Sequence, residues 1–190
     1  MTPAVLDRRK VLSQLFPNPD DYLFVTGLAG SARDTAGLTK DGTNLFTMAG
    51  AMGAATSMGL GVAMSAPNKK VVVVTGDGEL LMNIGSLATV ATIAPENFSI
   101  ICIDNGCHGE TGGQTGHTSN KTNLKMMAEG AGFSSTLLIE SEAELEQGVS
   151  FLNEAPGPRF IHLRVIDGAP TVFKRNMDLA ECRIRFRSAF

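Results

Sequence analysis

The sequence predicts an α/β fold, a three-layer open sandwich in which helices cover both faces of a mostly parallel sheet. Six apolar runs bounded by turn residues indicate the strands: 22–26, 45–48, 71–75, 98–103, 135–139 and 160–165. The runs are continuous rather than alternating, which is typical of strands buried on both faces. Helix-length segments separate most of them, so we expect the chain to be built from βαβ units.

Helix signals fall between these runs. Helices are expected at 4–16, 51–66, 79–94, 122–131 and 141–154. Four of them end just before a proline, which cannot continue a helix. These prolines are Pro17, Pro67, Pro95 and Pro156. The helix at 141–154 opens with Ser141-x-x-Glu144, the sequence of a capping box.

The segment 171–190 is predicted to be a basic C-terminal helix. It carries five basic residues against two acidic ones, with apolar residues among them. A solvated helix face explains such a pattern, and so does contact with a partner chain that leaves positive charge near an anionic substrate. We expect residues 1–190 to form a single domain, because a second full domain would not fit into this length.

Composition excludes several classes of function. The formal net charge is −3, so the chain has no basic excess for binding nucleic acid. The longest apolar tract, 49–66, is broken by glycines and is shorter than the about 20 residues that a bilayer core requires. The N-terminus lacks the apolar core of a signal peptide, so we expect a cytoplasmic protein without membrane contact. Three cysteines without a C-x-x-C pair predict buried thiols.

One turn places negative charge where anions usually bind. The valine-rich run 71–75 leads into Gly76-Asp77-Gly78-Glu79, at the predicted start of a helix. The backbone N–H groups of Gly78 and Glu79, with the helix dipole, favour an anion there. Asp77 would repel that anion unless a divalent cation stood between them. The side chain of Glu79 is explained as a first-turn acid that the helix dipole stabilises.

A second polar turn is expected beside the first. Asn105, in Asp-Asn-Gly, follows the strand at 98–103 and lies 28 residues after Asp77. That spacing fits one βαβ unit, whose two strands usually lie side by side and end at the same edge of the sheet. One carboxylate and one amide oxygen are hard ligands for Mg²⁺, and phosphate oxygens would complete its octahedron.

Competing interpretations of these turns are weaker. Gly-Asp-Gly alone is a common turn, but its pairing with Asp-Asn-Gly one unit later is far more specific. The sequence has no Gly-Lys-Ser/Thr, which excludes a P-loop, and no third glycine follows Gly76-Asp-Gly78 at the spacing of a dinucleotide fingerprint. The sequence therefore favours a site for Mg²⁺ and a diphosphate.

The stretch GDGELLMNIGSLATVATIAPENFSIICIDNG resembles the signature of thiamine diphosphate- and magnesium-dependent enzymes. With AGAMGAATSMGLGVAM, TGGQTGHT and KTNL, it resembles the β subunit of sulfopyruvate decarboxylase and the C-terminal domain of phosphonopyruvate decarboxylase. The similarity runs from about Tyr22 to the last helix. It implies the diphosphate-binding domain of the thiamine diphosphate-binding fold, with thiamine diphosphate and Mg²⁺ as cofactors.

The resemblance also implies residue roles. Asp77 and Asn105 would be side-chain ligands of Mg²⁺, and the backbone carbonyl of Cys107 would be the third ligand. Met52 would wedge beneath thiamine and hold it in its bent conformation. The implied cofactor-binding residues are Gly50, Ala51, Met52, Gly76, Asp77, Gly78, Glu79, Asn105, Cys107, His108, Gly109 and Glu110.

Candidate substrate contacts are the side chains of His108, Gln114 and His117, whereas His162 lies on a predicted core strand and is expected to be structural. The family pattern Tyr-Gly-Ser-Thr-Gly is replaced by a segment that contains Glu110. A carboxylate beside a diphosphate or an anionic substrate is unfavourable unless it points away, is protonated or meets a cation.

The glutamate that activates thiamine is expected on a separate pyrimidine-binding α subunit, which the resemblance implies as partner. The active site would lie between the two chains of a hetero-oligomer that also has contacts between β subunits. Three functions stay open: a decarboxylase subunit acting on a small anionic 2-oxo acid such as sulfopyruvate or phosphonopyruvate, the matching half of a thiamine-dependent carboligase, and a non-catalytic cofactor-binding module.

Overall fold

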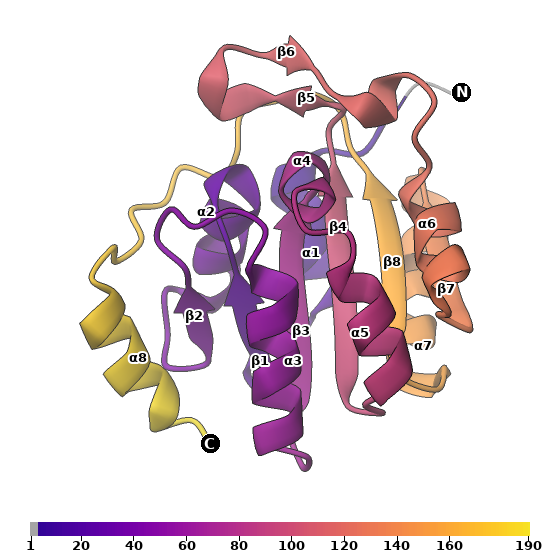
Figure 1. The fold of residues 1–190 in the computed structure, drawn as a ribbon. Helices are drawn as coiled ribbons and strands as arrows, with labels where there is room; N and C mark the ends of the chain where they lie inside the picture. The colour runs from indigo at the N-terminus through magenta and orange to yellow at the C-terminus, as the bar shows by residue number, and fades with distance from the viewer. Residues whose placement is uncertain (1–3) are drawn as a thin grey trace.

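The computed structural model describes residues 4–190 and contains one six-stranded parallel sheet (Figure 1). The spatial order of its strands is β2-β1-β3-β4-β8-β7. Their bounds are β1 Tyr22–Thr26, β2 Leu45–Thr47, β3 Lys70–Gly76, β4 Phe98–Asp104, β7 Ser135–Ile139 and β8 Arg159–Arg164. All six predicted strands are present, with ends that differ by one residue at most. The predicted α/β sandwich with a parallel sheet is confirmed.

The valine run of β3 shows why the apolar runs are continuous. Val71 and Val73 pack into the core on one face of the sheet, and Val72 and Val74 pack into the core on the other. Each is at most 1% exposed. Burial of a valine side chain contributes about 1.5–3 kcal/mol, so both faces of the central strand stabilise the fold.

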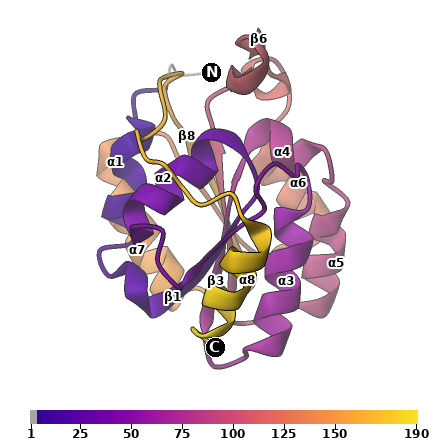
Figure 2. The ribbon, with the colours of Figure 1, turned by 90° about the vertical axis from the view of Figure 1, so that its left-hand side faces the viewer.

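Helices form a layer on each face of the sheet (Figure 2). On one face lie α1 (Arg8–Leu15), α2 (Ala29–Thr39) and α7 (Leu145–Glu154). On the other lie α3 (Ala55–Ser65), α5 (Ser86–Ile93) and α6 (Leu124–Ala131), with the short α4 (Asp77–Leu81) at the top. This arrangement leaves the carboxyl ends of the strands open to a cavity.

Two predicted helices begin later than expected. The helix predicted at 4–16 begins at Arg8, because Leu6 instead extends the sheet by a bridge to Val165; residues 1–3 lie outside the described part of the chain. The helix predicted at 51–66 begins at Ala55, because Gly53 takes a left-handed conformation with φ of +79°.

The helix predicted at 79–94 is divided into α4 and α5. Residues 82–85 form turns, and the Asn83 side chain donates a hydrogen bond to the carbonyl of Gly53 at 2.9 Å. Such side-chain bonds to distant backbone compete with helix formation. The break ends α4 at Leu81. At its other end α4 begins at Asp77, two residues before the predicted start, because β3 leads directly into it.

The helices predicted at 122–131 and 141–154 are present. Asn123 caps α6 by accepting a hydrogen bond from the N–H of Met126 at 3.0 Å. The segment 141–154 begins with a turn of 3₁₀ helix (Glu142–Glu144) before α7. There the Glu144 carboxylate accepts a hydrogen bond from the N–H of Ser141 at 3.0 Å, and the predicted capping box is present.

The C-terminal segment is helical only in part. Residues 171–178 are irregular, and α8 (Leu179–Arg187) begins where the Asp178 side chain accepts hydrogen bonds from two backbone N–H groups. In Figure 2 the chain after β8 crosses above the sheet before α8 packs beside β2. Phe186 of α8 contacts Phe46 of β2 with ring centroids 5.8 Å apart. The helix therefore covers the sheet edge at β2.

The helix α2 and a small hairpin were not predicted. The helix α2 has no regular spacing of large apolar residues, and its hydroxyl side chains bond back to its own backbone. The hairpin of β5 (Cys107–His108) and β6 (Gln114–Thr115) is formed by strands of only two residues each. In Figure 1 this hairpin lies above the carboxyl ends of the strands.

Candidate functional site

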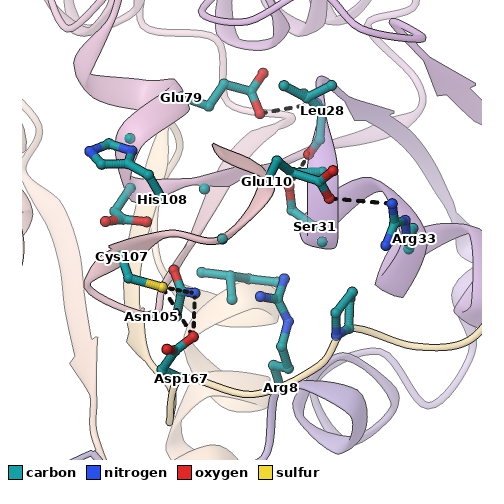
Figure 3. A pocket seen from close by; sticks show the side chains of 18 of the residues that line it. Arg8, Leu28, Ser31, Arg33, Glu79, Asn105, Cys107, His108, Glu110 and Asp167 are labelled. Atoms are coloured by element: carbon teal, nitrogen blue, oxygen red, sulfur yellow. Dashed lines mark hydrogen bonds and ion pairs between the residues drawn. The ribbon is translucent and has the colours of Figure 1, made fainter. Parts of the chain in front are cut away.

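The two polar turns lie beside each other, as predicted. β3 and β4 are paired neighbours, with Gly76 opposite Ile103 at their carboxyl ends. Asp77 directly follows Gly76, and Asn105 directly follows the last residue of β4. Both residues line one cavity of about 620 Å³ at this edge of the sheet. Figure 3 shows Asn105 among the residues of this cavity.

Most predicted cofactor residues line this cavity. They are Met52, Gly76, Asp77, Gly78, Glu79, Asn105, Cys107, His108, Gly109 and Glu110. Gly50 and Ala51 are not in its lining, although they directly precede Met52. The candidate substrate residues Gln114 and His117 are also outside it.

Asp77 is buried next to a second carboxylate. It is 3% exposed, and burial together with the nearby charge of Asp104 raises its pKa to about 6. The hydroxyl of Thr118 lies 2.7 Å from Oδ1 of Asp104 and 3.2 Å from Oδ2 of Asp77. The Thr118 hydroxyl and nearby backbone N–H groups stabilise the charge of Asp77 only in part, because its pKa stays raised. A bound cation would stabilise this charge further.

Asp104 is held in its charged form by other partners. Its Oδ2 lies 2.7 Å from Nε2 of His162, and its Oδ1 accepts a hydrogen bond from the N–H of Gly106 at 2.9 Å. Burial acts to raise the pKa of Asp104, but the hydrogen bonds with His162 and Thr118 outweigh it and lower the pKa overall. The buried position of His162, on β8, agrees with its predicted structural role.

The side-chain amide of Asn105 is fixed by two acceptors. Its Nδ2 donates to the Cys107 sulfur at 3.0 Å and to Oδ1 of Asp167 at 3.2 Å (Figure 3). This orientation leaves Oδ1 of Asn105 as the atom that can bind a metal. The Cys107 thiol donates to Asp167 at 3.0 Å, and burial and then Asp167 raise its pKa to about 11. The thiol therefore stays protonated at neutral pH.

The Glu79 side chain differs from the predicted first-turn acid stabilised by the helix dipole alone. It is 5% exposed, and its Oε2 accepts a hydrogen bond from the N–H of Leu28 at 3.2 Å. Burial raises its pKa to about 7, although the Leu28 hydrogen bond acts in the opposite direction. A Cβ on Gly27 would overlap the carboxylate, so only glycine fits there. Glu79 thus ties α4 to the start of α2.

The start of α2 is a second amide-rich wall of the cavity. Leu28, Ala29, Gly30 and Ser31 line it, and the helix has no side-chain cap. Ala29 has a φ of +62°, a left-handed conformation that is unusual outside glycine and is often found at functional sites. The sequence prediction missed this wall; the signal that could have indicated it is the pair Gly27 and Gly30, within four residues of the apolar run at 22–26.

Glu110 meets a cation, one of the three conditions stated for it. Its Oε1 lies 3.3 Å from Nη2 of Arg33, a residue of α2, and both side chains are partly exposed (Figure 3). The pairing removes much of the repulsion that an unpaired carboxylate would exert on a bound anion.

The three candidate substrate residues lie in different places. His108 lines the cavity and covers Gly78, where an added Cβ would lie 2.8 Å from the imidazole. His117 contacts His108 edge to face, with ring centroids 6.4 Å apart, but borders a separate pocket with Leu81. Gln114 is exposed and bonds to Thr111 of its own hairpin.

These residues fit an anion held through a divalent cation. Asp77, Asn105 and the backbone near Cys107 could supply the hard oxygen ligands that Mg²⁺ prefers, and the raised pKa of Asp77 is compatible with a ligand that lacks its metal. Two helix starts, of α2 and α4, bring N–H groups to the same cavity. The sequence did not identify Arg8, Asp104 or Asp167 as residues of the site. Arg8 and Asp167 are far from the two polar turns in the sequence, and Asp104 directly precedes the predicted ligand Asn105.

Comparison with known proteins identifies a family and several relatives of this chain. Residues 31–163 match the family model of the thiamine pyrophosphate enzyme C-terminal TPP binding domain. The chain is 36% identical over 147 residues to sulfopyruvate decarboxylase subunit beta of Methanocaldococcus jannaschii, with 77% of this chain and 76% of that protein covered. It is 37% identical over 186 residues to phosphonopyruvate decarboxylase of Streptomyces viridochromogenes, with 97% of this chain and 45% of that protein covered.

The fold also resembles a solved structure. A 2-oxoglutarate:ferredoxin oxidoreductase from Magnetococcus marinus superimposes with a TM-score of 0.65 at 14% identity, over 90% of this chain and 67% of that chain. At this identity the likeness concerns the fold alone. Between residues 4 and 190, no helix has the length and apolar character required to cross a bilayer.

Proposed function

The chain belongs to the thiamine pyrophosphate enzymes, as their C-terminal TPP-binding domain, and we propose that it is the diphosphate-binding subunit of a heteromeric 2-oxo acid decarboxylase. Thiamine diphosphate, with Mg²⁺ as its usual metal, is the cofactor of this family, so the predicted resemblance and cofactors are confirmed. The names of the relatives favour a small anionic 2-oxo acid, of the sulfopyruvate or phosphonopyruvate type, as substrate.

The single observation that carries the proposal is the position of Asp77 and Asn105 at the ends of paired strands, facing one cavity. In the proposal both side chains hold Mg²⁺, together with the Cys107 carbonyl. The N–H groups of Gly78 and Glu79 donate to the diphosphate, and Met52 supports the thiamine rings. Met52 lines the cavity and is 40% exposed, so its side chain is free to be covered by a ligand.

When bound, thiamine diphosphate supplies the electron sink that decarboxylation of a 2-oxo acid requires. This chain orients the group and neutralises its charge. The imidazole of His108 borders the cavity, and we assign it a contact with substrate. The activating glutamate and the pyrimidine site belong to the proposed α subunit, so the active site forms between the chains.

Reconstitution tests the proposal. The purified chain is mixed with a pyrimidine-binding subunit of the sulfopyruvate decarboxylase type, thiamine diphosphate and Mg²⁺, and CO₂ release from sulfopyruvate and phosphonopyruvate is measured. We expect turnover only in the mixture. If the mixture forms a stable complex that binds the cofactor and still releases no CO₂ from any 2-oxo acid, the chain is a non-catalytic module.

A further inference from the structure

Arg8 projects a buried guanidinium into the cavity. It stands at the first position of α1, and its side chain is only 9% exposed. Arg8 is nevertheless part of the cavity lining, together with residues from α2 and the Asp167 segment. Figure 3 shows its guanidinium rising into the open space between these elements. A buried charge of this kind is costly unless it has a partner for each polar face.

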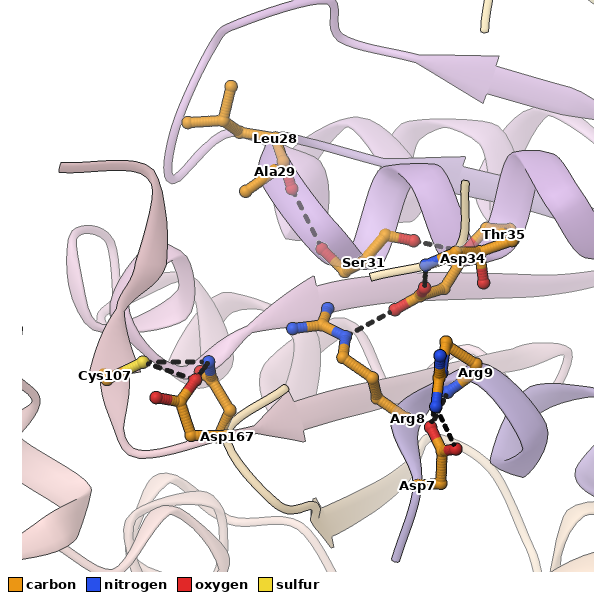
Figure 4. A network of polar contacts seen from close by, with 12 residues as sticks. Asp7, Arg8, Arg9, Leu28, Ala29, Ser31, Asp34, Thr35, Cys107 and Asp167 are labelled. Carbon is orange, nitrogen blue, oxygen red and sulfur yellow. Dashed lines mark hydrogen bonds and ion pairs between the residues drawn. The ribbon is translucent and has the colours of Figure 1, made fainter. Parts of the chain in front are cut away.

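One nitrogen of this guanidinium, Nε, is paired with a carboxylate, and the two outer nitrogens are not. Nε of Arg8 donates to Oδ2 of Asp34 at 2.8 Å (Figure 4). Oδ1 of Asp34 accepts a hydrogen bond from the N–H of Thr171 at 2.7 Å. Within residues 4–190, neither outer nitrogen of Arg8 has a hydrogen-bond partner. Asp34 thus fixes the orientation of Arg8 and leaves its two-nitrogen edge toward the cavity.

The backbone of α2 is shaped around the same edge. A Cβ on Gly30 would overlap Nη2 of Arg8, so glycine lets the guanidinium lie directly against the first turn of the helix. The outer nitrogens and the uncapped N–H groups of α2 therefore border one space. Donors from a guanidinium and from a helix start together are suited to the several oxygens of a phosphoryl group.

The two outer nitrogens of Arg8 remain open to a ligand. The cavity lining has two arginines, and each is paired with one carboxylate: Arg33 with Glu110, and Arg8 with Asp34 through Nε alone. Asp77 and Asp167 add negative charge to the same walls. A diphosphate carries more charge than one Mg²⁺ neutralises, so a further fixed cation would stabilise its binding.

We propose that Arg8 is a cofactor-binding residue, whose outer nitrogens donate to a phosphoryl group of the diphosphate on the side opposite Gly78 and Glu79. This inference rests on the proposed function, because it takes the cavity to be the diphosphate site. Asp34 is the positioning residue in this arrangement. Nothing in the charge pattern or motifs of the sequence pointed to Arg8.

The test measures binding of magnesium pyrophosphate and of magnesium thiamine diphosphate to the full chain by titration calorimetry. Arg8→Met should weaken both by about 10- to 100-fold, the usual effect of losing charge-assisted hydrogen bonds. Arg8→Lys should recover part of the loss. Arg9→Met is the matched control, because Arg9 is the next residue of α1 and pairs with Asp7 at the surface. This variant should bind both ligands with wild-type affinity.

A second variant distinguishes loss of binding from loss of folding. Arg8→Met leaves Asp34 buried without its cation, which is destabilising. The double variant Arg8→Met/Asp34→Asn removes both charges and retains an acceptor for Thr171, so it should keep the wild-type circular dichroism spectrum and still bind pyrophosphate weakly.

The outcomes separate this inference from the proposed function. Wild-type affinity for magnesium pyrophosphate in the folded double variant would overturn the role of Arg8. An unchanged pyrophosphate affinity together with a raised KM for substrate would also overturn it, because Arg8 would then contact the substrate instead. If wild type itself binds neither ligand and Asp77→Ala changes nothing, the diphosphate site and the inference both fail.

Discussion

The amide of Asn105 donates a hydrogen bond to the carboxylate of Asp167, with Nδ2 and Oδ1 3.2 Å apart. The two residues are 62 positions apart in the chain. Asp167 lies just after β8, which is paired with β4, so the order of the sheet brings it to the proposed metal ligand. The contact decides which amide atom of Asn105 faces the cavity.

Removal of Asp167 should weaken metal binding. In Asp167→Ala the amide of Asn105 loses one of its two acceptors, and partners of this kind typically change metal affinity by about 10- to 100-fold. We expect an increase of at least about tenfold in the Mg²⁺ concentration needed for half-saturation with thiamine diphosphate. Asp167→Asn retains an acceptor and should fall between wild type and Asp167→Ala. Equal half-saturation in all three proteins would show that Asp167 does not orient Asn105.

Glu79 should make the stability of the ligand-free protein fall as pH rises. Burial raises its pKa to about 7 from an ordinary value of 4.5. The folded state therefore binds more protons than the unfolded state between these pH values, and the free energy of unfolding decreases across this window by about 3 kcal/mol. Asp77, with a pKa of about 6, acts in the same direction at lower pH.

Urea denaturation of wild type and Glu79→Gln, followed from about pH 4.5 to about pH 7.5, measures this contribution. The amide of this variant can still accept a hydrogen bond from the N–H of Leu28 but cannot ionise, so the variant should lose less stability with rising pH than wild type. Parallel curves for the two proteins would mean that the Glu79 carboxylate is solvated rather than buried.

The ion pair of Glu110 and Arg33 should tune the affinity for anions. Glu110→Gln leaves Arg33 unpaired at the rim, and we expect magnesium pyrophosphate to bind about two- to fivefold more tightly at low salt. Arg33→Met should have the opposite effect, and the double variant should be close to wild type. Because both side chains are partly exposed, about 0.5 M NaCl should remove the differences; effects that persist in high salt would contradict a screened pair.

Product analysis separates decarboxylase from carboligase. The reconstituted enzyme, supplied with pyruvate-like and sulfonated or phosphonated 2-oxo acids, should release CO₂ and the corresponding aldehyde. Gas chromatography and NMR identify the products. Acetolactate or another carbon–carbon coupled product as the main species would instead assign the chain to a carboligase.

The sequence alone predicted the structure correctly where a local pattern is compatible with only one arrangement of the chain. Residues 71–74 of the run 71–75 are all valine, so this strand requires burial on both faces, and its position next to 98–103 follows from the βαβ connection. The pairing of Asp77 with Asn105 at one sheet edge could therefore be predicted. Most of the residues assigned to the cofactor lie around one cavity for the same reason.

Other features depend on tertiary contacts that no local pattern encodes. Arg8 and Asp167 come from opposite ends of the chain. Asp167 reaches the cavity because β8 lies beside β4, and Arg8 reaches it because Leu6 bridges to Val165, just after β8. The buried state of Glu79 follows from its contact with Leu28, 51 residues away. The helix α2 has little amphipathic spacing, and its start became visible as a cavity wall only in three dimensions.

Magnesium-dependent binding of thiamine diphosphate to Asp77→Ala tests the central claim most directly. Titration calorimetry of the variant, with its fold checked by circular dichroism, should show loss of binding by about 100-fold or more, because the metal loses its one carboxylate ligand and the diphosphate loses its bridging cation. Binding with wild-type affinity and an unchanged Mg²⁺ requirement would contradict the account.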